Sequence, residues 1–439
     1  MTETRSIVEL AKAAREASRK LALASTEVKN SALQAIADAL IEEQAAILEA
    51  NQQDCKEVAE LVAKAEMAKP LLDRLKLDAA KLGTMAESVR AVASLDDPVG
   101  QTISRTLLDD GLELQKVTCP LGVLAIIFES RPDAVTQISA LALKSGNAAL
   151  LKGGREAARS NQVLLETIWK AIRNFPELTE DALILLTERE QINSLLSLDN
   201  LIDLVIPRGS NELVRYIQSN TKIPVLGHAE GLCHIYIDES ARLDMALDIV
   251  CDAKLQYPAA CNAVETILVH SKIAPLFLPE LFERLTSQGV ELRCCERTKA
   301  LLDKPDILLA TEQDWQTEYC GLIVSIKIVD AVSQAIDHIN LYGSGHTDSI
   351  ITEDRKNAES FLNRVDSAGV YHNASTRFAD GFRYGFGAEV GISTNKIHAR
   401  GPVGLDGLLS YKYKLYGCGQ TVSNYSGSQA RPFKHKKLV

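Results

Sequence analysis

The first hundred residues carry apolar positions that recur every three or four residues, which is the spacing of one face of an α-helix. Ile7 and Leu10 begin one such face. Leu33 begins another after Ser25, a residue suited to start a helix. Helices are therefore predicted up to about residue 93, with ordinary core-facing sides.

Two short strand-like runs follow at 107–114, on either side of Asp110-Gly111. An Asp-Gly pair favours the type I′ turn of a β-hairpin. A hairpin between a helical segment and the next part of the chain is a candidate protruding arm.

Apolar strand-like runs alternate with helical segments from residue 121 onwards. The first run, 123–128, is apolar throughout and precedes a predicted helix at 133–144. Such strands, separated by helices, indicate a parallel sheet covered on both sides, with ligands at the carboxyl ends of its strands. Further strands of this series are predicted at 148–151, 183–186 and 201–206.

A second βα series follows a loop at 256–263. Its strands are predicted at 265–269, 290–293, 306–309, 322–328, 349–351 and 369–372. The chain is thus expected to be an α/β protein with two βα domains built on parallel sheets. The final stretch, 421–439, is polar and basic, which predicts a flexible tail.

Length and composition fit a soluble globular protein of two or three domains, with 439 residues of which 46% are apolar. No apolar run approaches the ~18–20 residues that cross a bilayer, and the first residues lack the apolar core of a secretory signal. The 48 basic and 58 acidic residues argue against a nucleic-acid partner. Nine scattered cysteines without a CxxC spacing indicate reduced thiols in the cytoplasm and no metal site.

Cys261 is the best candidate nucleophile. It lies in the loop between two βα units, where a scaffold can position a reactive group. A thiol near backbone dipoles or cations is a good nucleophile, although many cysteines are simply buried and inert. A Cys/His hydrolase would need an oriented histidine, for which His228 and His234 are available.

Two turns have the composition of phosphate-binding turns. The segments 152–155 (KGGR) and 208–211 (RGSN) each follow a predicted strand and open a helix. A plain turn with a surface lysine and an ordinary N-cap explain the same residues equally well.

Five short motifs follow one another along the chain. They are ESRPD at 129–133, KGG at 152–154, GHAEGLCH at 227–234, YPAACN at 257–262 and GFRYGFGAEVGIS at 381–393. In this order they resemble the γ-glutamyl phosphate reductases of the aldehyde dehydrogenase superfamily. These are the glutamate-5-semialdehyde dehydrogenases of proline biosynthesis, and the match extends to about residue 420.

The resemblance implies three structural parts. They are an NADPH-binding domain at 1–103 and 123–238 with part of 385–403, a catalytic domain at 239–384, and a β-hairpin oligomerisation arm at 104–122 and 404–420. It also implies a homodimer or homotetramer.

The resemblance further implies NADPH-dependent reduction of L-glutamate 5-phosphate to L-glutamate 5-semialdehyde and phosphate. Cys261 matches the catalytic cysteine, whose thiolate forms a thioester and whose backbone N–H helps to hold the oxyanion. Lys152 matches the lysine on the adenosine ribose, and Glu318 matches the glutamate on the nicotinamide ribose. The implied cofactor-binding residues are Lys152, Gly153, Gly154, Arg155, Gly209, Ser210 and Glu318.

Two departures from the wider superfamily are informative. Val225 stands where hydrolytic members keep a water-activating glutamate, which suits an enzyme whose thioester should meet hydride or phosphate. Arg155 stands where many members have a glutamate that favours NAD, and a cation suits the 2′-phosphate of NADP(H). The asparagine of the oxyanion hole has no clear match and falls near Ser130 and Arg131.

A substrate phosphate requires Arg, Lys or a helix N-terminus. The candidate substrate contacts are Ser130, Arg131, Asn262, Lys396 and Arg400. The alternatives are a hydrolytic NAD(P)-dependent semialdehyde dehydrogenase, which Val225 disfavours, and a catalytically silent oligomeric scaffold. Because an acyl phosphate is labile, transient contact with glutamate 5-kinase would protect it, but no residue indicates a docking site.

Overall fold

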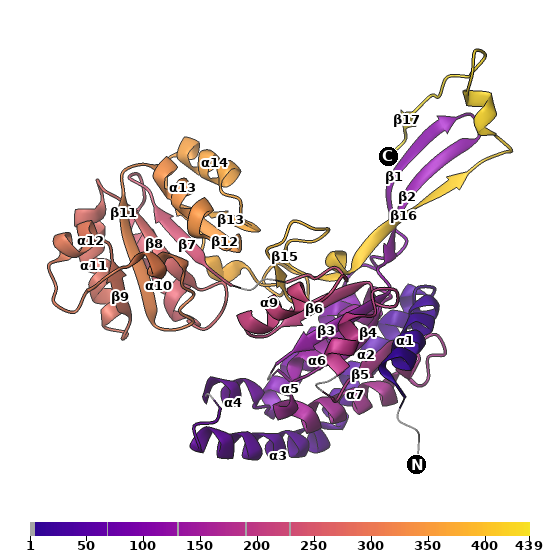
Figure 1. The fold of residues 1–439 in the computed structure, drawn as a ribbon, viewed down its shortest axis with the longest axis horizontal. Helices are drawn as coiled ribbons and strands as arrows, with labels where there is room; N and C mark the ends of the chain where they lie inside the picture. Colours follow the sequence, from indigo (N-terminus) through magenta and orange to yellow (C-terminus); the bar gives the residue numbers. More distant parts are fainter. Residues whose placement is uncertain (1–4, 68, 130, 189–190, 228–229) are drawn as a thin grey trace.

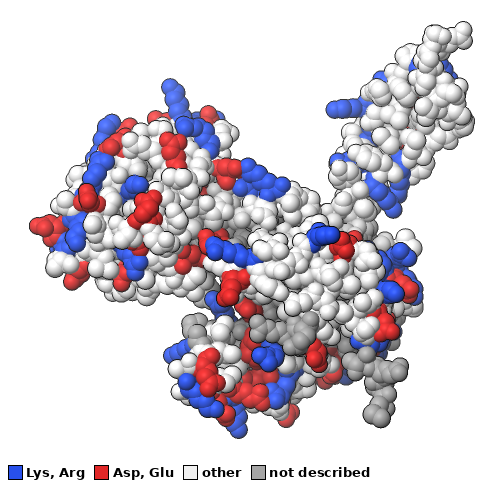
Figure 2. Space-filling model, viewed as in Figure 1, with Lys and Arg blue, Asp and Glu red and all other residues white. Residues whose placement is uncertain are grey.

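The computed structural model describes residues 5–67, 69–129, 131–188, 191–227 and 230–439. Figure 1 shows a helical βα unit at the bottom, a second βα unit on the left and a narrow β-arm at the upper right. Figure 2 shows charges of both signs across the two βα units, whereas the arm has a mainly uncharged surface with patches of Lys and Arg. No helix among the described residues is long and apolar enough to cross a membrane.

The helices that precede the first strand begin at side-chain caps. Ser6 and Glu9 form a capping box at the first helix, and Ser25 accepts a hydrogen bond from Val28 N at the second, as its sequence predicted. These helices are α1 (Ile7–Leu21), α2 (Thr26–Glu42), α3 (Gln44–Ala63), α4 (Lys69–Leu75) and α5 (Ala79–Ser94).

The first sheet is parallel and has the strand order β5-β4-β3-β6. Its strands are β3 (Val123–Phe128), β4 (Ala148–Lys152), β5 (Leu183–Leu185) and β6 (Leu204–Arg208). The helices between and after them are α6 (Asp133–Lys144), α7 (Ala158–Ile172), α8 (Gln191–Leu196) and α9 (Asn211–Ser219), with helical turns η1 (Arg155–Ala157) and η2 (Glu180–Ala182). Every residue of β3 and β4 is buried, which explains why these strands read as continuous apolar runs.

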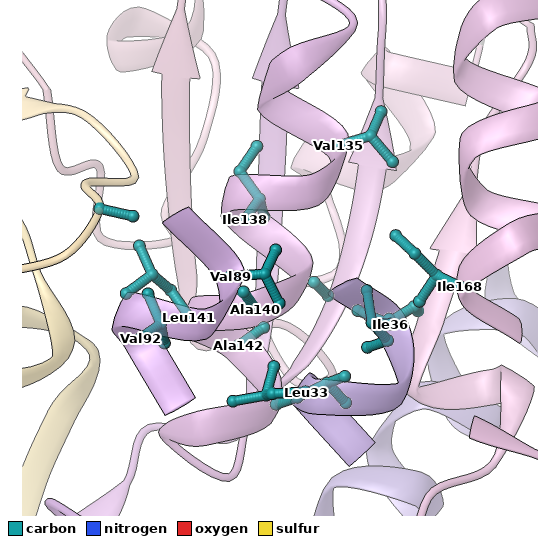
Figure 3. Close-up of a cluster of buried hydrophobic side chains, with 14 of the residues drawn as sticks. Leu33, Ile36, Val89, Val92, Val135, Ile138, Ala140, Leu141, Ala142 and Ile168 are labelled. Atoms are coloured by element: carbon teal, nitrogen blue, oxygen red, sulfur yellow. The ribbon is translucent and has the colours of Figure 1, made fainter. Parts of the chain in front are cut away.

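The core of the first unit lies where the N-terminal helices pack on this sheet's own helices. Figure 3 shows side chains of α2, α5, α6 and α7 that point toward one another: Leu33, Ile36, Val89, Val92, Val135, Ile138, Ala140, Leu141, Ala142 and Ile168. Residues from the far end of the sequence, Val390, Val403, Leu405 and Leu408, join the same cluster. The segment after residue 385 therefore packs back onto the first unit.

The second sheet is also parallel and has the order β10-β9-β11-β8-β7-β12-β13. Its strands are β7 (Cys233–Ile237), β8 (Val264–His270), β9 (Glu291–Cys294), β10 (Leu308–Leu309), β11 (Ile323–Val329), β12 (Thr347–Ile351) and β13 (Gly369–His372). Its helices are α10 (Leu243–Leu255), α11 (Ala274–Thr286), α12 (Glu296–Leu302), α13 (Val332–Tyr342) and α14 (Arg355–Arg364), with turns η3 (Glu312–Gln316) and η4 (Thr376–Phe378). The pattern analysis did not predict β7, although it lies inside the sheet.

The arm is an antiparallel sheet of order β16-β2-β1-β17. Its strands are β1 (Thr102–Asp109), β2 (Leu112–Pro120), β16 (Leu409–Tyr416) and β17 (Lys436–Lys437). The hairpin at Asp110-Gly111 is present, but its turn is not of type I′. Such a turn needs a positive φ at both residues, and only Gly111 (φ 69°) has one. A register shift between Leu107 and Asp109 accommodates the difference.

The structure contradicts the prediction that segment 421–439 is a flexible tail. It forms the turn η6 (Val422–Tyr425) and then pairs with the outer edge of β1 through β17. Asp109 accepts a hydrogen bond from Tyr425 Oη at 3.0 Å and pairs with Arg431 at 3.1 Å. The basic side chains of this segment therefore pair with the acidic residue at the tip of the hairpin. Its backbone pairs with an edge of β1 that would otherwise be open.

A small antiparallel pair, β14 (Ile392–Ser393) with β15 (Gly401–Pro402), and the turn η5 (Leu405–Leu408) precede β16. The predicted arm segment 404–420 is thus a strand only over Leu409–Tyr416.

Candidate active site

Cys261 lies in the turn between α10 and β8, at the amino end of the second sheet. Its neighbour in space is the start of β7, because Cys233 pairs in register with Val264. Cys233 Sγ donates a hydrogen bond to the Cys261 carbonyl at 3.4 Å. A Cβ built on Gly231 would lie 2.3 Å from that same carbonyl oxygen, so only glycine lets the two segments approach. The packing of β7 therefore fixes the backbone of Cys261.

Asn262 anchors the cysteine turn from its other side. The side chain is buried, and its Nδ2 donates to the Ala379 carbonyl at 2.8 Å. Within the described ranges, no carbonyl accepts a hydrogen bond from the Cys261 N–H. The turn thus holds the thiol beside a free backbone donor, which is the arrangement that an oxyanion needs.

Two arginines lie within electrostatic reach of the Cys261 thiol. One is Arg208 at the carboxyl end of β6, and the other is Arg377 in η4. Burial is the largest influence that lowers the pKa of each guanidinium. Arg377 Nε donates to Gln256 Oε1 at 2.9 Å, which fixes it beside the cysteine turn. Arg377 belongs to no recognisable sequence motif, so its place near Cys261 was not predicted.

Lys152 and the two glycines after it lie where the sequence placed them, at the carboxyl end of β4. Lys152 is buried, and its Nζ donates to the Gly153 carbonyl at 2.6 Å. A Cβ on Gly153 would lie 2.2 Å from Asn161 Nδ2, and one on Gly154 would lie 2.0 Å from Glu156 Oε1. Close packing against Asn161 and Phe128 therefore favours glycine at 153, whereas at 154 only the flexible carboxylate of Glu156 lies close. Arg155, the next residue, is exposed.

The Gly209-Ser210 turn opens α9, where Ser210 Oγ accepts from Leu213 N at 3.4 Å. The Ser210 N–H donates to Glu129 Oε2 at 3.0 Å. Glu129 follows β3 and belongs to the first of the five motifs, but sequence reasoning gave it no role. Its carboxylate occupies the Ser210 amide and so links the segment after β3 to the start of α9.

Glu318 lies in the loop before β11, close to a buried ion pair that the sequence did not reveal. Glu265 Oε2 accepts from Lys254 Nζ at 2.7 Å, and Glu265 Oε1 accepts from Cys320 N at 3.3 Å. Desolvation raises the pKa of Glu265 to about 7, and the Glu318 carboxylate adds to this. Cys320 has φ +52°, a conformation that this hydrogen bond helps to hold. In the sequence, the one sign of this ion pair is Glu265, an acidic residue inside the apolar run 264–269.

The remaining predicted substrate residues do not all share the same contacts. Lys396 and Arg400 both pair with Asp366, Arg400 at 3.0 Å. Arg131 is half-buried and lies within electrostatic reach of Arg208. Ser130 falls outside the described residues. Among the residues described, no cluster of His, Cys, Asp and Glu could hold a metal ion.

These residues fit a phosphorylated dinucleotide. The carboxyl ends of β3, β4 and β6 meet at one edge of the first sheet and bring together a buried Lys152, the exposed Arg155 and the start of α9. Cations and backbone amides at such an edge are the usual ligands of a dinucleotide's phosphates.

Comparisons with known proteins agree with one another. The aldehyde dehydrogenase family model matches residues 2–298 and 296–388. A γ-glutamyl phosphate reductase of Acaryochloris marina is 56% identical over 99% of this chain and 99% of its own. One of Methanosarcina barkeri is 54% identical over 97% of this chain and 96% of its own. The crystal structure of γ-glutamyl phosphate reductase from Thermotoga maritima superposes with a TM-score of 0.90 at 42% identity, covering 95% of this chain and 100% of that chain.

Proposed function

The chain belongs to the γ-glutamyl phosphate reductases of the aldehyde dehydrogenase family, and from this premise we propose that Cys261 carries out their chemistry with NADPH. Its reaction is the reduction of L-glutamate 5-phosphate to L-glutamate 5-semialdehyde, a step of proline biosynthesis. The observation that carries the proposal is the Cys261 turn, which holds a thiol beside an N–H that no described carbonyl accepts and beside two arginines.

The first step is an acyl transfer to Cys261. The thiolate attacks C5 of the acyl phosphate, the S–C5 bond forms, and the C5–O bond to the phosphoryl group breaks. The electron pair of that bond leaves with the phosphate, and a thioester remains on Cys261. The Cys261 N–H stabilises the negative charge that gathers on the carbonyl oxygen during attack, while Arg208 and Arg377 surround the thiol with positive charge.

Lys152, Gly153, Gly154, Arg155, Gly209, Ser210 and Glu318 would hold the cofactor, which supplies the hydride that reduces the thioester to the aldehyde. Lys152 and Glu318 are proposed to hold its two riboses. Arg155 is exposed at the start of η1, where it can meet the 2′-phosphate that distinguishes NADP(H) from NAD(H).

Val225 supports reduction and phosphorolysis over hydrolysis. It stands at the edge of the first sheet, where its neighbours Pro224 and Leu226 hydrogen-bond with Val205, and its side chain has no proton-accepting atom. A thioester beside such a residue meets no activated water from this position. The nine cysteines are free thiols, which supports the proposal that the enzyme works in the reducing cytoplasm.

The deciding experiment runs the reaction in the oxidative direction. NADP⁺ reduction by glutamate semialdehyde is measured with and without inorganic phosphate, on the wild type, on Cys261→Ser and on Cys418→Ser. Cys418 is an exposed thiol on the arm and serves as the matched control.

We expect strict phosphate dependence in the wild type and in Cys418→Ser, and no activity in Cys261→Ser. Activity without phosphate would mean that water resolves the thioester, which favours the hydrolytic alternative. An active Cys261→Ser would remove the proposed mechanism.

A further inference from the structure

Arg208 is a buried cation that forms no ion pair with any described residue. Its Nη1 is buried and has no hydrogen-bond partner. Across the described part of the chain, no carboxylate lies within salt-bridge distance of its guanidinium. An arginine normally reaches such a buried place together with a carboxylate or phosphate, because an unpaired buried charge is strongly unfavourable.

A second arginine adds to the positive charge at this place. Arg131, four residues beyond Ile127 of β3, lies within electrostatic reach of Arg208 and lowers the pKa of that guanidinium further than burial does alone. The carboxylate of Glu389 is also nearby, but burial raises its pKa, and it accepts a hydrogen bond from Gly381 N at 2.8 Å. Glu389 and Asp133 both act on Arg208 electrostatically, but the two arginines form no salt bridge with any described carboxylate.

The direction of the Arg208 side chain separates it from the expected pyrophosphate turn. Ile206 and Arg208 lie on the same side of β6, and a Cβ built on Gly391 would lie 3.7 Å from atoms of both. Pro207 lies on the opposite side, where it packs against Gly227. Arg208 therefore extends toward the segment 389–391 and the Cys261 thiol, with which it interacts electrostatically.

We propose that Arg208, assisted by Arg131, binds the phosphoryl group of the acyl-phosphate substrate and retains it as phosphate when it leaves. This inference rests on the function proposed above. One bridging oxygen joins the phosphorus to the carbon that Cys261 attacks, so a guanidinium beside the thiol lies beside the leaving group. The α-carboxylate of the substrate is four carbon atoms farther along the chain.

Binding at this place has a chemical consequence. As the C5–O bond breaks, its electron pair moves onto the phosphate, and two guanidinium groups are placed to receive that charge. In the oxidative direction the same groups hold inorganic phosphate against the thioester, so that a phosphate oxygen forms the C5–O bond and the S–C5 bond breaks. Arg208 thus determines that the acceptor is phosphate.

The test replaces Arg208 with Gln and measures the oxidative reaction. Loss of a charge-assisted contact predicts a KM for inorganic phosphate that rises about 10- to 100-fold. The KM values for NADP⁺ and for glutamate semialdehyde should change less than about threefold on the same scale. Arg208→Lys should recover part of the loss, because it keeps the charge but not the fork of donors. Arg173→Gln, which removes an exposed arginine paired with Glu180 on the same unit, is the control.

A second readout does not depend on turnover. Inorganic phosphate should slow the alkylation of Cys261 by iodoacetamide in the wild type, and this protection should be lost in Arg208→Gln. Arg131→Gln, at a half-buried position, provides the same comparison if Arg208→Gln does not fold.

Three results would overturn the assignment. A raised KM for semialdehyde with an unchanged KM for phosphate would place the α-carboxylate at Arg208. A raised KM for NADP⁺ would place the cofactor's phosphates there. Unchanged kinetics and unchanged protection would leave Arg208 without a ligand role. A wild type that is active without phosphate contradicts the proposed function instead, and the protection assay still reports on Arg208.

Discussion

Arg155 is the residue on which the choice between NADPH and NADH is proposed to depend. It is exposed at the start of η1, three residues after the buried Lys152, and the structure gives it no ion pair with any described residue. Its charge is therefore available to an incoming phosphate group.

Arg155→Glu should reverse the electrostatics of this position. The carboxylate would repel a 2′-phosphate and could accept hydrogen bonds from a ribose hydroxyl. We expect the ratio of kcat/KM for NADPH over NADH to fall about 10- to 100-fold. Arg173→Glu, at the C-cap of α7, is the control, and an unchanged ratio in Arg155→Glu would show that the 2′-phosphate binds elsewhere.

Glu265 links the stability of the protein to pH. Desolvation raises its pKa to about 7, against an ordinary value of 4.5, so folding takes up a proton between these two values. The stabilisation is present below the lower value, and it is lost as the pH rises toward about 7, because the buried carboxylate must then ionise.

Glu265→Gln should remove this pH dependence. The amide has one oxygen, which can accept from Lys254 Nζ or from the Cys320 N–H in place of the two carboxylate oxygens, and the amide does not titrate. Urea unfolding across pH 4.5 to 7 measures the change in the free energy of unfolding. If the slope of the wild type persists in Glu265→Gln while exposed Glu239→Gln removes it, the titrating group has been misassigned.

At the scale of elements, the arm depends on segments from distant parts of the sequence. β1 pairs on one side with β2 and on the other with β17, and the Arg105 N–H donates to the Val439 carbonyl at 3.2 Å. Leu438 N donates back to the Arg105 carbonyl at 2.8 Å. The segment 421–439 is therefore the protective cover of an otherwise open strand edge.

Truncation after residue 420 tests this cover. The β1 amide of Arg105 should lose its protection against hydrogen exchange, while amides between β2 and β16 should remain protected. Exchange mass spectrometry of peptides from β1 and β2 separates the two. Equal protection of β1 in the full and the shortened chain would mean that the tail does not pair in solution.

Sequence patterns located the elements whose burial is uniform. The bounds predicted for β3 and α6 agree with the structure, because both elements are buried along nearly their whole length and read as apolar runs of different lengths. β7 was not predicted because its first residues, Cys233 and His234, continue a loop-like motif. The ordered structure of segment 421–439 was not predicted because it depends on contacts with Asp109 and with the edge of β1, which no local pattern reveals.

The features of the site also fall into two groups, those that a local sequence pattern predicts and those that it does not. The cysteine turn and the two glycine turns have local signatures, and the structure places them at strand ends. The contacts of Glu129 with Ser210 and of Arg377 with Gln256 join residues that lie far apart along the chain. Such contacts follow only from the tertiary fold.

At the scale of the whole molecule, the arm presents an exposed strand edge. β16 forms one outer edge, and along it Tyr411, Tyr413, Leu415 and Tyr416 are each about half exposed or more. Exposed Tyr411, Tyr413 and Leu415 alternate along β16 with Lys412 and Lys414, so one face of this edge strand is apolar and favours contact with another chain. We therefore expect a homo-oligomer, a dimer or a tetramer, assembled through the arm.

Deletion of residues 105–119 should yield monomers. The deletion removes β2, on which β16 is paired, and with it the ordered edge that a second copy would meet. Light scattering after size-exclusion chromatography gives the mass of each species. A deletion variant that keeps the mass of the wild-type oligomer would show that another surface joins the subunits.

The arm also has a consequence for the order in which a ribosome delivers the chain. The β1–β2 hairpin emerges early, whereas β16 and β17, which cover its two edges, emerge last. At ~5–20 residues per second, the nascent hairpin waits tens of seconds with both edges open. The cross-strand pair of Arg105 with Glu113, at 2.8 Å, and the neighbouring Lys116 place charge on the waiting strands. These side chains act as gatekeepers against premature pairing between nascent chains until translation supplies the strands that belong there.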